Sequence, residues 1–254
     1  MKKRKAGIGI FVIVLIITAV RVKSMDSHRI SGRILAENIA GPGMLRLVEQ
    51  SMQAQARKTS VTEIAVKERK HPQAALTFDD GPDIRYTPLL LDGLKERNVR
   101  VSFFLLGEKV EQYPELVERM QKEGHLVGNH TYHHVQLNKL NETKAREEIL
   151  KTNNLIYETT GVYPLYLRPP FGAWKKNLEL CVEMLPVFWT IDTLDWKVQN
   201  TEKIVRTVQE QIEDGAIILM HDEYDTSVEA ALQVVDELKN QGYELVTVDQ
   251  LILP

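Results

Sequence analysis

The sequence is poor in cysteine, shows no excess of basic charge and contains no low-complexity tract. Its single cysteine, Cys181, excludes an internal disulfide and a zinc finger built on several thiolates. The 32 lysines and arginines against 35 acidic residues leave a net charge of −3, without the strong basic excess typical of nucleic-acid-binding proteins. The 254 residues include 43% hydrophobic and 26% charged residues, which excludes wholesale disorder and suits one large or two small α/β domains.

One uninterrupted apolar run stands out, at residues 6–20. Basic residues flank it on both sides, at Lys2, Lys3, Arg4 and Lys5 and at Arg21 and Lys23. A positive flank before an apolar run is typical of an export or membrane signal. The run is shorter than the roughly 17–25 residues of a full span, but basic side chains at its ends can extend it. We predict that residues 1–23 anchor the chain in the cell membrane as a single pass, with the remainder extracellular. A cleaved signal peptide on a secreted protein is the alternative.

Residues 24–70 are predicted to form a juxtamembrane connector of short helices or partly ordered chain. Gly41-Pro42-Gly43 interrupts its apolar positions. From about His71 the pattern changes to short apolar runs that alternate with amphipathic stretches. Residues 71–254 are therefore predicted to form the main folded domain.

Within that domain, the pattern predicts strands and helices in alternation. The strands are expected at 74–78, 101–105, 126–128, 166–168, 187–191, 216–220 and 245–248. The helices are expected at 87–97, 114–123, 142–160, 201–213 and 228–240. Such alternation indicates parallel pairing in an α/β barrel or open sheet, where active residues gather at the carboxyl ends of strands. Polar residues at those ends should therefore converge on one rim: Asp79, Asp80, His130, Arg168, Asp192 and His221.

The first polar motif is TFDDGP, at residues 77–82. Two adjacent carboxylates, Asp79 and Asp80, are tolerated if one binds a cation and the other is paired with a positive side chain. A solvated Asp-Gly turn after a strand is the ordinary alternative.

The second motif is HTYHH, at residues 130–134. Histidines four residues apart can present two imidazoles to one metal, and His133 competes with His134 by position. One aspartate with two histidines leaves open coordination positions, as a catalytic site needs. A histidine-rich surface loop is the alternative.

Three further motifs are RPPFG (168–172), DTLDW (192–196) and LMH (219–221). The rigid proline turn can aim a backbone N–H at a developing oxyanion, and Arg168 can hold a carboxylate ionised. Trp196 offers a flat apolar wall, while Asp195 can orient His221 and raise its pKa so that it serves as a general acid. The ordinary alternatives are a surface arginine on a rigid turn, a core tryptophan beside a loop, and a satisfied core histidine.

Taken together and in this order, the five motifs resemble those of the polysaccharide deacetylase family, the carbohydrate esterases of family four with a NodB-type homology domain. The resemblance runs from about residue 71 to the C-terminus. It implies a distorted (β/α) barrel and a metal-dependent hydrolase that removes N-acetyl groups from an N-acetylglucosamine glycan, foremost peptidoglycan. Chitin oligomers, an exported polysaccharide or acetylated xylan are alternative substrates. A noncatalytic glycan-binding protein is a further alternative.

The same resemblance implies roles for individual residues. Asp80, His130 and His134 would hold a divalent cation, zinc foremost, with cobalt or another transition metal as alternatives. Asp79 would be the general base, and Arg168 would keep it ionised.

His221 would be the general acid, with Asp195 supporting its charged form. Substrate contacts are implied for Phe171, through its backbone N–H, and for Pro170, Trp196 and Leu219. Trp174, next to the RPPFG turn, is a candidate sugar platform by position.

Overall fold

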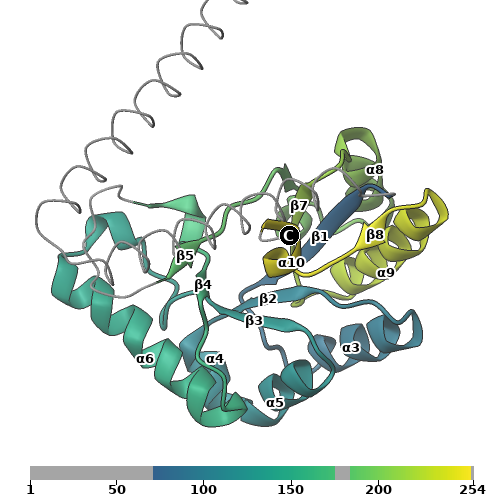
Figure 1. Cartoon of the computed structure of the whole chain (residues 1–254). Helices are drawn as coiled ribbons and strands as arrows, with labels where there is room; N and C mark the ends of the chain where they lie inside the picture. Colours follow the sequence, from purple (N-terminus) through teal and green to yellow (C-terminus); the bar gives the residue numbers. More distant parts are fainter. Residues whose placement is uncertain (1–70, 175–183, 253–254) are drawn as a thin grey trace, which may run out of the picture. The chain divides into compact units, whose positions relative to one another are not determined.

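The computed structural model describes residues 71–174 and 184–252 (Figure 1). They fall within one folded unit, Glu68–Pro254. The predicted anchor at 1–23 and connector at 24–70 lie outside the described residues. Within the described ranges, every helix is too short or too polar to span a membrane.

The core of the unit is a single sheet in which every pairing is parallel. Along the sheet the order is β5-β4-β3-β2-β1-β7-β6, and β8 pairs with the start of β1. The strands are β1 (Gln73–Asp79), β2 (Ser102–Leu105), β3 (Leu126–Asn129), β4 (Tyr166–Leu167), β5 (Leu185–Pro186), β6 (Ile191–Asp192), β7 (Ala216–His221) and β8 (Glu244–Leu245). Parallel pairing confirms the prediction from alternating strands and helices.

The sheet curls until its two edge strands come near each other. β5 and β6 are consecutive in the chain, yet they end the strand order on opposite sides. Between them, the Val187 N–H donates to the Leu167 carbonyl oxygen at 2.8 Å, whereas the Thr190 N–H donates to that of Ile217 at 2.9 Å. The chain thus crosses from β4 to β7 within a few residues. This crossing gives the distorted barrel that was predicted. It also makes the continuous strand predicted at 187–191 wrong, since the segment changes partner midway.

Most helices cover the outside of the curled sheet, whereas the last one, near the C-terminus, packs against its inner side (Figure 1). They are α3 (Tyr86–Glu96), α4 (Gly107–Gln112), α5 (Pro114–Lys122), α6 (Glu142–Thr160), α7 (Asp195–Val198), α8 (Thr201–Gln211), α9 (Asp225–Asn240) and α10 (Val248–Ile252), with 3-10 turns η1 (Leu137–Lys139) and η2 (Pro170–Gly172). The longest of the described helices, α6, begins where the Asn141 side chain accepts the Lys144 N–H at 2.9 Å and ends at Gly161 with φ of 72°. The five predicted helices are confirmed.

Three short helices, α4, α7 and α10, were missed because each is too short to show a periodicity. The strand predicted at 245–248 is also wrong in its extent. The observed strand, β8, pairs with β1 at Glu244 and Leu245, and the Val246 N–H donates to the Ala74 carbonyl oxygen at 3.0 Å. The chain then turns at Thr247 into α10, whose first N–H, on Val248, donates to the Ser102 hydroxyl at 3.0 Å.

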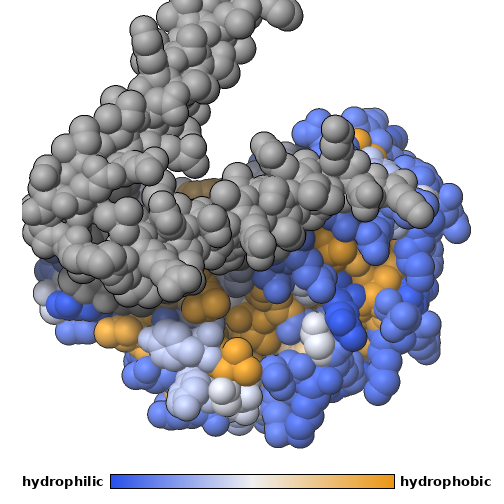
Figure 2. Space-filling model, viewed as in Figure 1, coloured by the Kyte–Doolittle hydropathy of each residue, from blue (hydrophilic) through white to orange (hydrophobic). Residues whose placement is uncertain are grey.

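Successive side chains of a strand point to opposite faces, so the apolar residues of the central strands belong to two separate clusters. On β1, Leu76 and Phe78 pack with the helices, whereas Ala75 belongs to a second cluster that includes Phe104 of β2 and Val248 of α10. Thr77 and Asp79 share the parity of Ala75, so the interior becomes polar toward the carboxyl end of β1. On the face shown in Figure 2, hydrophobic residues gather centrally and hydrophilic residues lie around them.

Candidate active site

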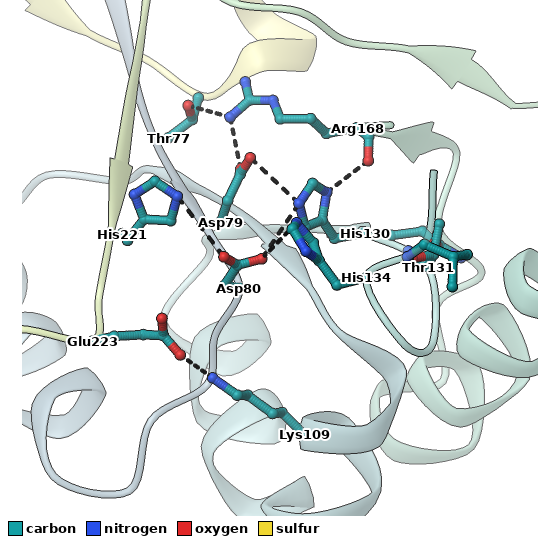
Figure 3. A network of polar contacts seen from close by, with 12 residues as sticks. Thr77, Asp79, Asp80, Lys109, His130, Thr131, His134, Arg168, His221 and Glu223 are labelled. Atoms are coloured by element: carbon teal, nitrogen blue, oxygen red, sulfur yellow. Dashed lines mark hydrogen bonds and ion pairs between the residues drawn. The ribbon is translucent and has the colours of Figure 1, made fainter. Parts of the chain in front are cut away.

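The two adjacent carboxylates reach the same site because the backbone turns between them. Asp79 is the last residue of β1 and lies in register with His221 of β7 and Phe104 of β2. Successive side chains of a strand point to opposite faces, which would separate Asp79 from Asp80. Asp80, however, has a φ of 69°, a left-handed conformation that aspartate tolerates better than most residues. Both carboxylates therefore lie in one polar network (Figure 3).

Asp80, His130 and His134 form a cluster suited to a cation. Their ligand atoms all lie within 4.8 Å of one another. Nε2 of each histidine is 3.4 Å from Oδ1 of Asp80, a buried oxygen without a hydrogen-bond partner among the described residues. An orphaned carboxylate oxygen facing two imidazole nitrogens fits a divalent metal, and this donor set suits zinc.

The hydrogen bonding and burial of His130 suit its imidazole to binding a metal. Its Nδ1 lies 2.6 Å from the Arg168 carbonyl oxygen, which leaves Nε2 for a ligand. Burial lowers the pKa of His130 to about 3, against the opposing charge of Asp80, so the ring is neutral at physiological pH. Neutral imidazole is the form that binds metal.

Helix α6 holds the HTYHH loop from outside the cluster. The Glu148 carboxylate accepts the backbone N–H groups of Tyr132 at 3.0 Å and His133 at 2.9 Å. It also lies 2.8 Å from Nδ1 of His133, whose side chain is 59% exposed. His133 thus faces Glu148, whereas His134 lies in the cluster. Sequence reasoning missed Glu148, because a glutamate on a helix surface carries no distinguishing signal.

Asp79 and Arg168 form a fully buried ion pair. Nη1 of Arg168 donates to Oδ1 of Asp79 at 2.8 Å and to the Thr77 hydroxyl at 2.7 Å. The guanidinium carbon lies 4.2 Å from the centre of the Phe104 ring. Burial raises the pKa of Asp79, and Arg168 opposes that rise. Arg168 is therefore an interior partner of Asp79, not a surface residue on a rigid turn. Thr77, the first residue of the TFDDGP motif, is a further partner of Arg168 for which the sequence analysis predicted no role.

His221 and Asp195 form a second pair at the rim. Nδ1 of His221 lies 2.8 Å from Oδ1 of Asp195, and the His221 backbone N–H donates to Oδ2 at 2.8 Å. Burial alone would lower the pKa of His221, but the hydrogen bond and charge of Asp195 outweigh it and raise the pKa to about 9. The other ring nitrogen, Nε2, lies 3.9 Å from Oδ2 of Asp80, so the proton-bearing ring faces the cluster.

The predicted substrate-contacting residues occupy different environments. Phe171 is 61% exposed, has a φ of 59°, and its ring centre lies 4.5 Å from that of His134. Trp196 is exposed on α7, whereas Leu219 of β7 and Pro170 are buried. Trp174 packs against the cluster of Leu137, Ala145, Ile149 and Leu167, so its use as a sugar platform stays a prediction. Asp192 ends β6, and its Oδ1 accepts the Leu194 N–H at 3.0 Å.

Comparisons with known proteins find similarity to one family of enzymes. The family described as polysaccharide deacetylase matches residues 66–187. The peptidoglycan-N-acetylglucosamine deacetylase PgdA of Listeria monocytogenes is 42% identical over 185 residues, which are 73% of this chain and 40% of that protein. A peptidoglycan-N-acetylglucosamine deacetylase of Bacillus cereus is 40% identical over 70% of this chain and 68% of its own length.

Among solved structures, that of the peptidoglycan deacetylase PdaC from Bacillus subtilis superimposes with a TM-score of 0.70 at 42% identity. The match covers 72% of this chain and 90% of the PdaC chain. The chain spans about two fifths of the length of the Listeria relative. The motifs, the curled parallel sheet and these matches together show that the chain belongs to the polysaccharide deacetylase family.

Proposed function

We propose that this chain is a metal-dependent hydrolase that removes the N-acetyl group from N-acetylglucosamine units of peptidoglycan and releases acetate. One observation carries the proposal. A buried carboxylate with a raised pKa (Asp79) and a histidine with a raised pKa (His221) both adjoin the Asp80–His130–His134 cluster. The relatives named as peptidoglycan deacetylases support the choice of polymer.

Asp79 serves as the general base. Its Oδ1 is held by Arg168 at 2.8 Å, and its Oδ2 lies 3.7 Å from Nε2 of His130, at the edge of the cluster. A carboxylate whose pKa is raised by burial accepts a proton more readily than an ordinary surface aspartate. Arg168 keeps the group ionised enough to act and fixes its orientation. Asp79 thus takes the proton of the attacking water.

His221 serves as the general acid. Amines leave poorly unless protonated, so hydrolysis of an amide requires a proton donor. The pKa of about 9 keeps the ring charged at neutral pH, and Asp195 holds Nδ1 so that Nε2 carries the proton toward the cluster. His221 protonates the departing sugar nitrogen, which completes acetate release.

Asp80, His130 and His134 would hold the cation. Zinc or a similar divalent metal there supplies a Lewis acid for the acetamide carbonyl and for activation of water. The Phe171 backbone N–H is proposed to stabilise the developing oxyanion by a hydrogen bond. The left-handed turn at Phe171 presents this N–H. Trp196, Leu219 and Pro170 are proposed to line the place of the acetyl group.

We further propose that residues 1–23 anchor the enzyme in the cell membrane with the catalytic domain outside. The apolar run at 6–20 with its basic flanks supports this, and peptidoglycan is an extracellular polymer. Protease accessibility of the domain in intact cells, compared with lysed cells, tests this location. Protection of the domain in intact cells would contradict it.

The function is tested by acetate release from the purified full-length protein. The substrates are peptidoglycan, N-acetylglucosamine oligomers and acetylated xylan, each with chelated protein and with protein to which zinc or cobalt is restored. We expect release from peptidoglycan that disappears on chelation and returns with metal. Preference for oligomers or for xylan would reassign the substrate. Release by the Asp79→Asn variant at the wild-type rate would refute the proposed chemistry.

A further inference from the structure

Asp222 follows His221 directly and has no role in the site as described so far. Its side chain is fully buried, and its Oδ1 has no hydrogen-bond partner among the described residues. A buried carboxyl group without full hydrogen bonding costs stability. The contacts that Asp222 makes with neighbouring residues explain why a carboxylate is buried beside His221.

The Asp222 carboxylate lies against Gly81, the residue after Asp80. A Cβ placed on Gly81 would lie 2.5 Å from Oδ1 of Asp222 and 2.9 Å from Oδ2. The φ of Gly81 lies outside the left-handed region, so its backbone conformation would accept an ordinary L residue. Asp222, rather than backbone strain, therefore excludes a side chain at position 81.

A hydroxyl relay ties Asp222 to the rest of the same turn. The Thr87 hydroxyl donates to Oδ2 of Asp222 and accepts the Asp83 N–H at 2.7 Å. Oδ1 of Asp83 in turn accepts the Tyr86 N–H at 2.9 Å, at the start of α3. Asp222 thus contacts the turn at Gly81 directly and at Asp83 through Thr87.

The opposite side of the turn is held by the neighbouring strand. The Leu106 N–H, just after β2, donates to the Gly81 carbonyl oxygen at 3.2 Å. Lys109 and Glu223 form an ion pair that lies below Asp80, the residue before Gly81, in Figure 3. Gly81 is therefore fixed between the ends of β2 and β7, and Asp222 forms the β7 side of that clamp.

We propose that Asp222 is a positioning residue for the metal site: its carboxylate sets the path of the chain at Gly81 and thereby places Asp80. The inference rests on the proposed function for the identity of the Asp80–His130–His134 cluster as a metal site. It adds that the geometry of this cluster depends on a residue that touches neither metal nor substrate.

The test measures zinc affinity of the metal-stripped full-length protein by competition with a chromophoric chelator. The variants are Gly81→Ala, Asp222→Ala, the double variant and the isosteric Asp222→Asn. Loss of an outer partner of a metal ligand typically lowers affinity about 10- to 100-fold. We expect a loss in this range for each single alanine variant. The double variant should bind better than Gly81→Ala alone, because the smaller residue at 222 makes room for the added methyl group.

Asp222→Asn keeps the shape and the acceptor for Thr87, so it should stay within about threefold of wild type. Glu123→Gln is the matched control. It alters another carboxylate with a buried, unpartnered oxygen, at the C-terminal end of α5, and should leave zinc affinity unchanged. Thermal unfolding of every variant identifies any that is not folded.

Two results would overturn the inference. One is a folded Gly81→Ala variant with wild-type zinc affinity; the other is a double variant whose loss equals the sum of the two single losses in free energy. In either case, the proposed function still holds if the wild-type protein binds zinc and releases acetate. Wild-type protein without measurable zinc affinity would overturn both.

Discussion

The site contains two pairs in which a carboxylate contacts a cationic side chain. The two pairs differ in which partner has its pKa raised. In the interior pair, Asp79 and Arg168 are both fully buried, and burial raises the pKa of the acid. In the rim pair, Asp195 is buried while His221 retains some exposure, and the carboxylate raises the pKa of the histidine to about 9. In the proposed mechanism, these environments suit one pair to accepting a proton and the other to donating one. The four predictions below test this contrast.

The largest effect is expected from removing the proton acceptor. Asp79→Asn keeps the size of the side chain and a hydrogen-bond acceptor for Arg168 but cannot take a proton. We expect kcat for acetate release to fall by about 100- to 10,000-fold, the usual contribution of a general base. Zinc affinity, measured on the same preparation, should change little, and a large loss of zinc would assign Asp79 to the metal instead.

Breaking the interior pair from the other side should mainly affect stability. Arg168→Met leaves Asp79 buried without its charge partner, and such a change typically costs about 3–5 kcal/mol. Urea unfolding at pH 7 measures the cost. The double variant Arg168→Met/Asp79→Asn should recover part of it, since no unpaired charge then remains. Equal stabilities of the single and double variants would show that the charge of Asp79 is compensated elsewhere.

A buried histidine away from the site isolates the effect of burial. His125, whose Nδ1 accepts the Val101 N–H at 3.1 Å, has its pKa lowered to about 4 mainly by burial. With an ordinary value near 6.5, its stabilising contribution is complete above that pH and is lost as pH falls toward 4. The loss should reach up to about 3 kcal/mol.

Urea unfolding at pH 7 and pH 4.5 checks the expectation for His125. His125→Gln should unfold with less dependence on pH over this interval than wild type. His71→Gln, at an exposed position, is the matched control and should keep the wild-type dependence. An unchanged dependence in His125→Gln would place the acid sensitivity in other groups.

The smallest effect is a shift of a pH limb. Asp195→Asn keeps a hydrogen-bond acceptor for His221 but removes the charge that raises its pKa. Because the proposed general acid, His221, must be protonated, we expect activity to fall as pH rises through its pKa, and in the variant this fall should begin at lower pH. We expect about a tenfold lower kcat at pH 8 and a smaller change at pH 6. An alkaline limb that does not move would assign it to another group.

Much of the fold and of the site follows from local sequence patterns. The strands β1, β2, β3 and β7 are readable as buried apolar runs, and the five longer helices are readable because their apolar periodicities extend over enough residues to be recognised. The five motifs lie at the carboxyl ends of strands or in the loops that follow, and the carboxyl ends of parallel strands meet at one edge. The convergence of Asp79, Asp80, His130, Arg168 and His221 was therefore predictable, as was the family resemblance.

Other features depend on contacts between residues far apart in the chain. The left-handed turn at Asp80, the orientation of His133 toward Glu148, and the clamp of Asp222 on Gly81 all arise where separate strands and helices meet. The break in the strand predicted at 187–191 likewise depends on which neighbour each half pairs with. Propensity and periodicity describe a residue and its near neighbours, so the sequence by itself determined which groups are present and at which strand ends. Only tertiary packing decided how they are oriented, because orientation is set by distant partners that no local pattern records.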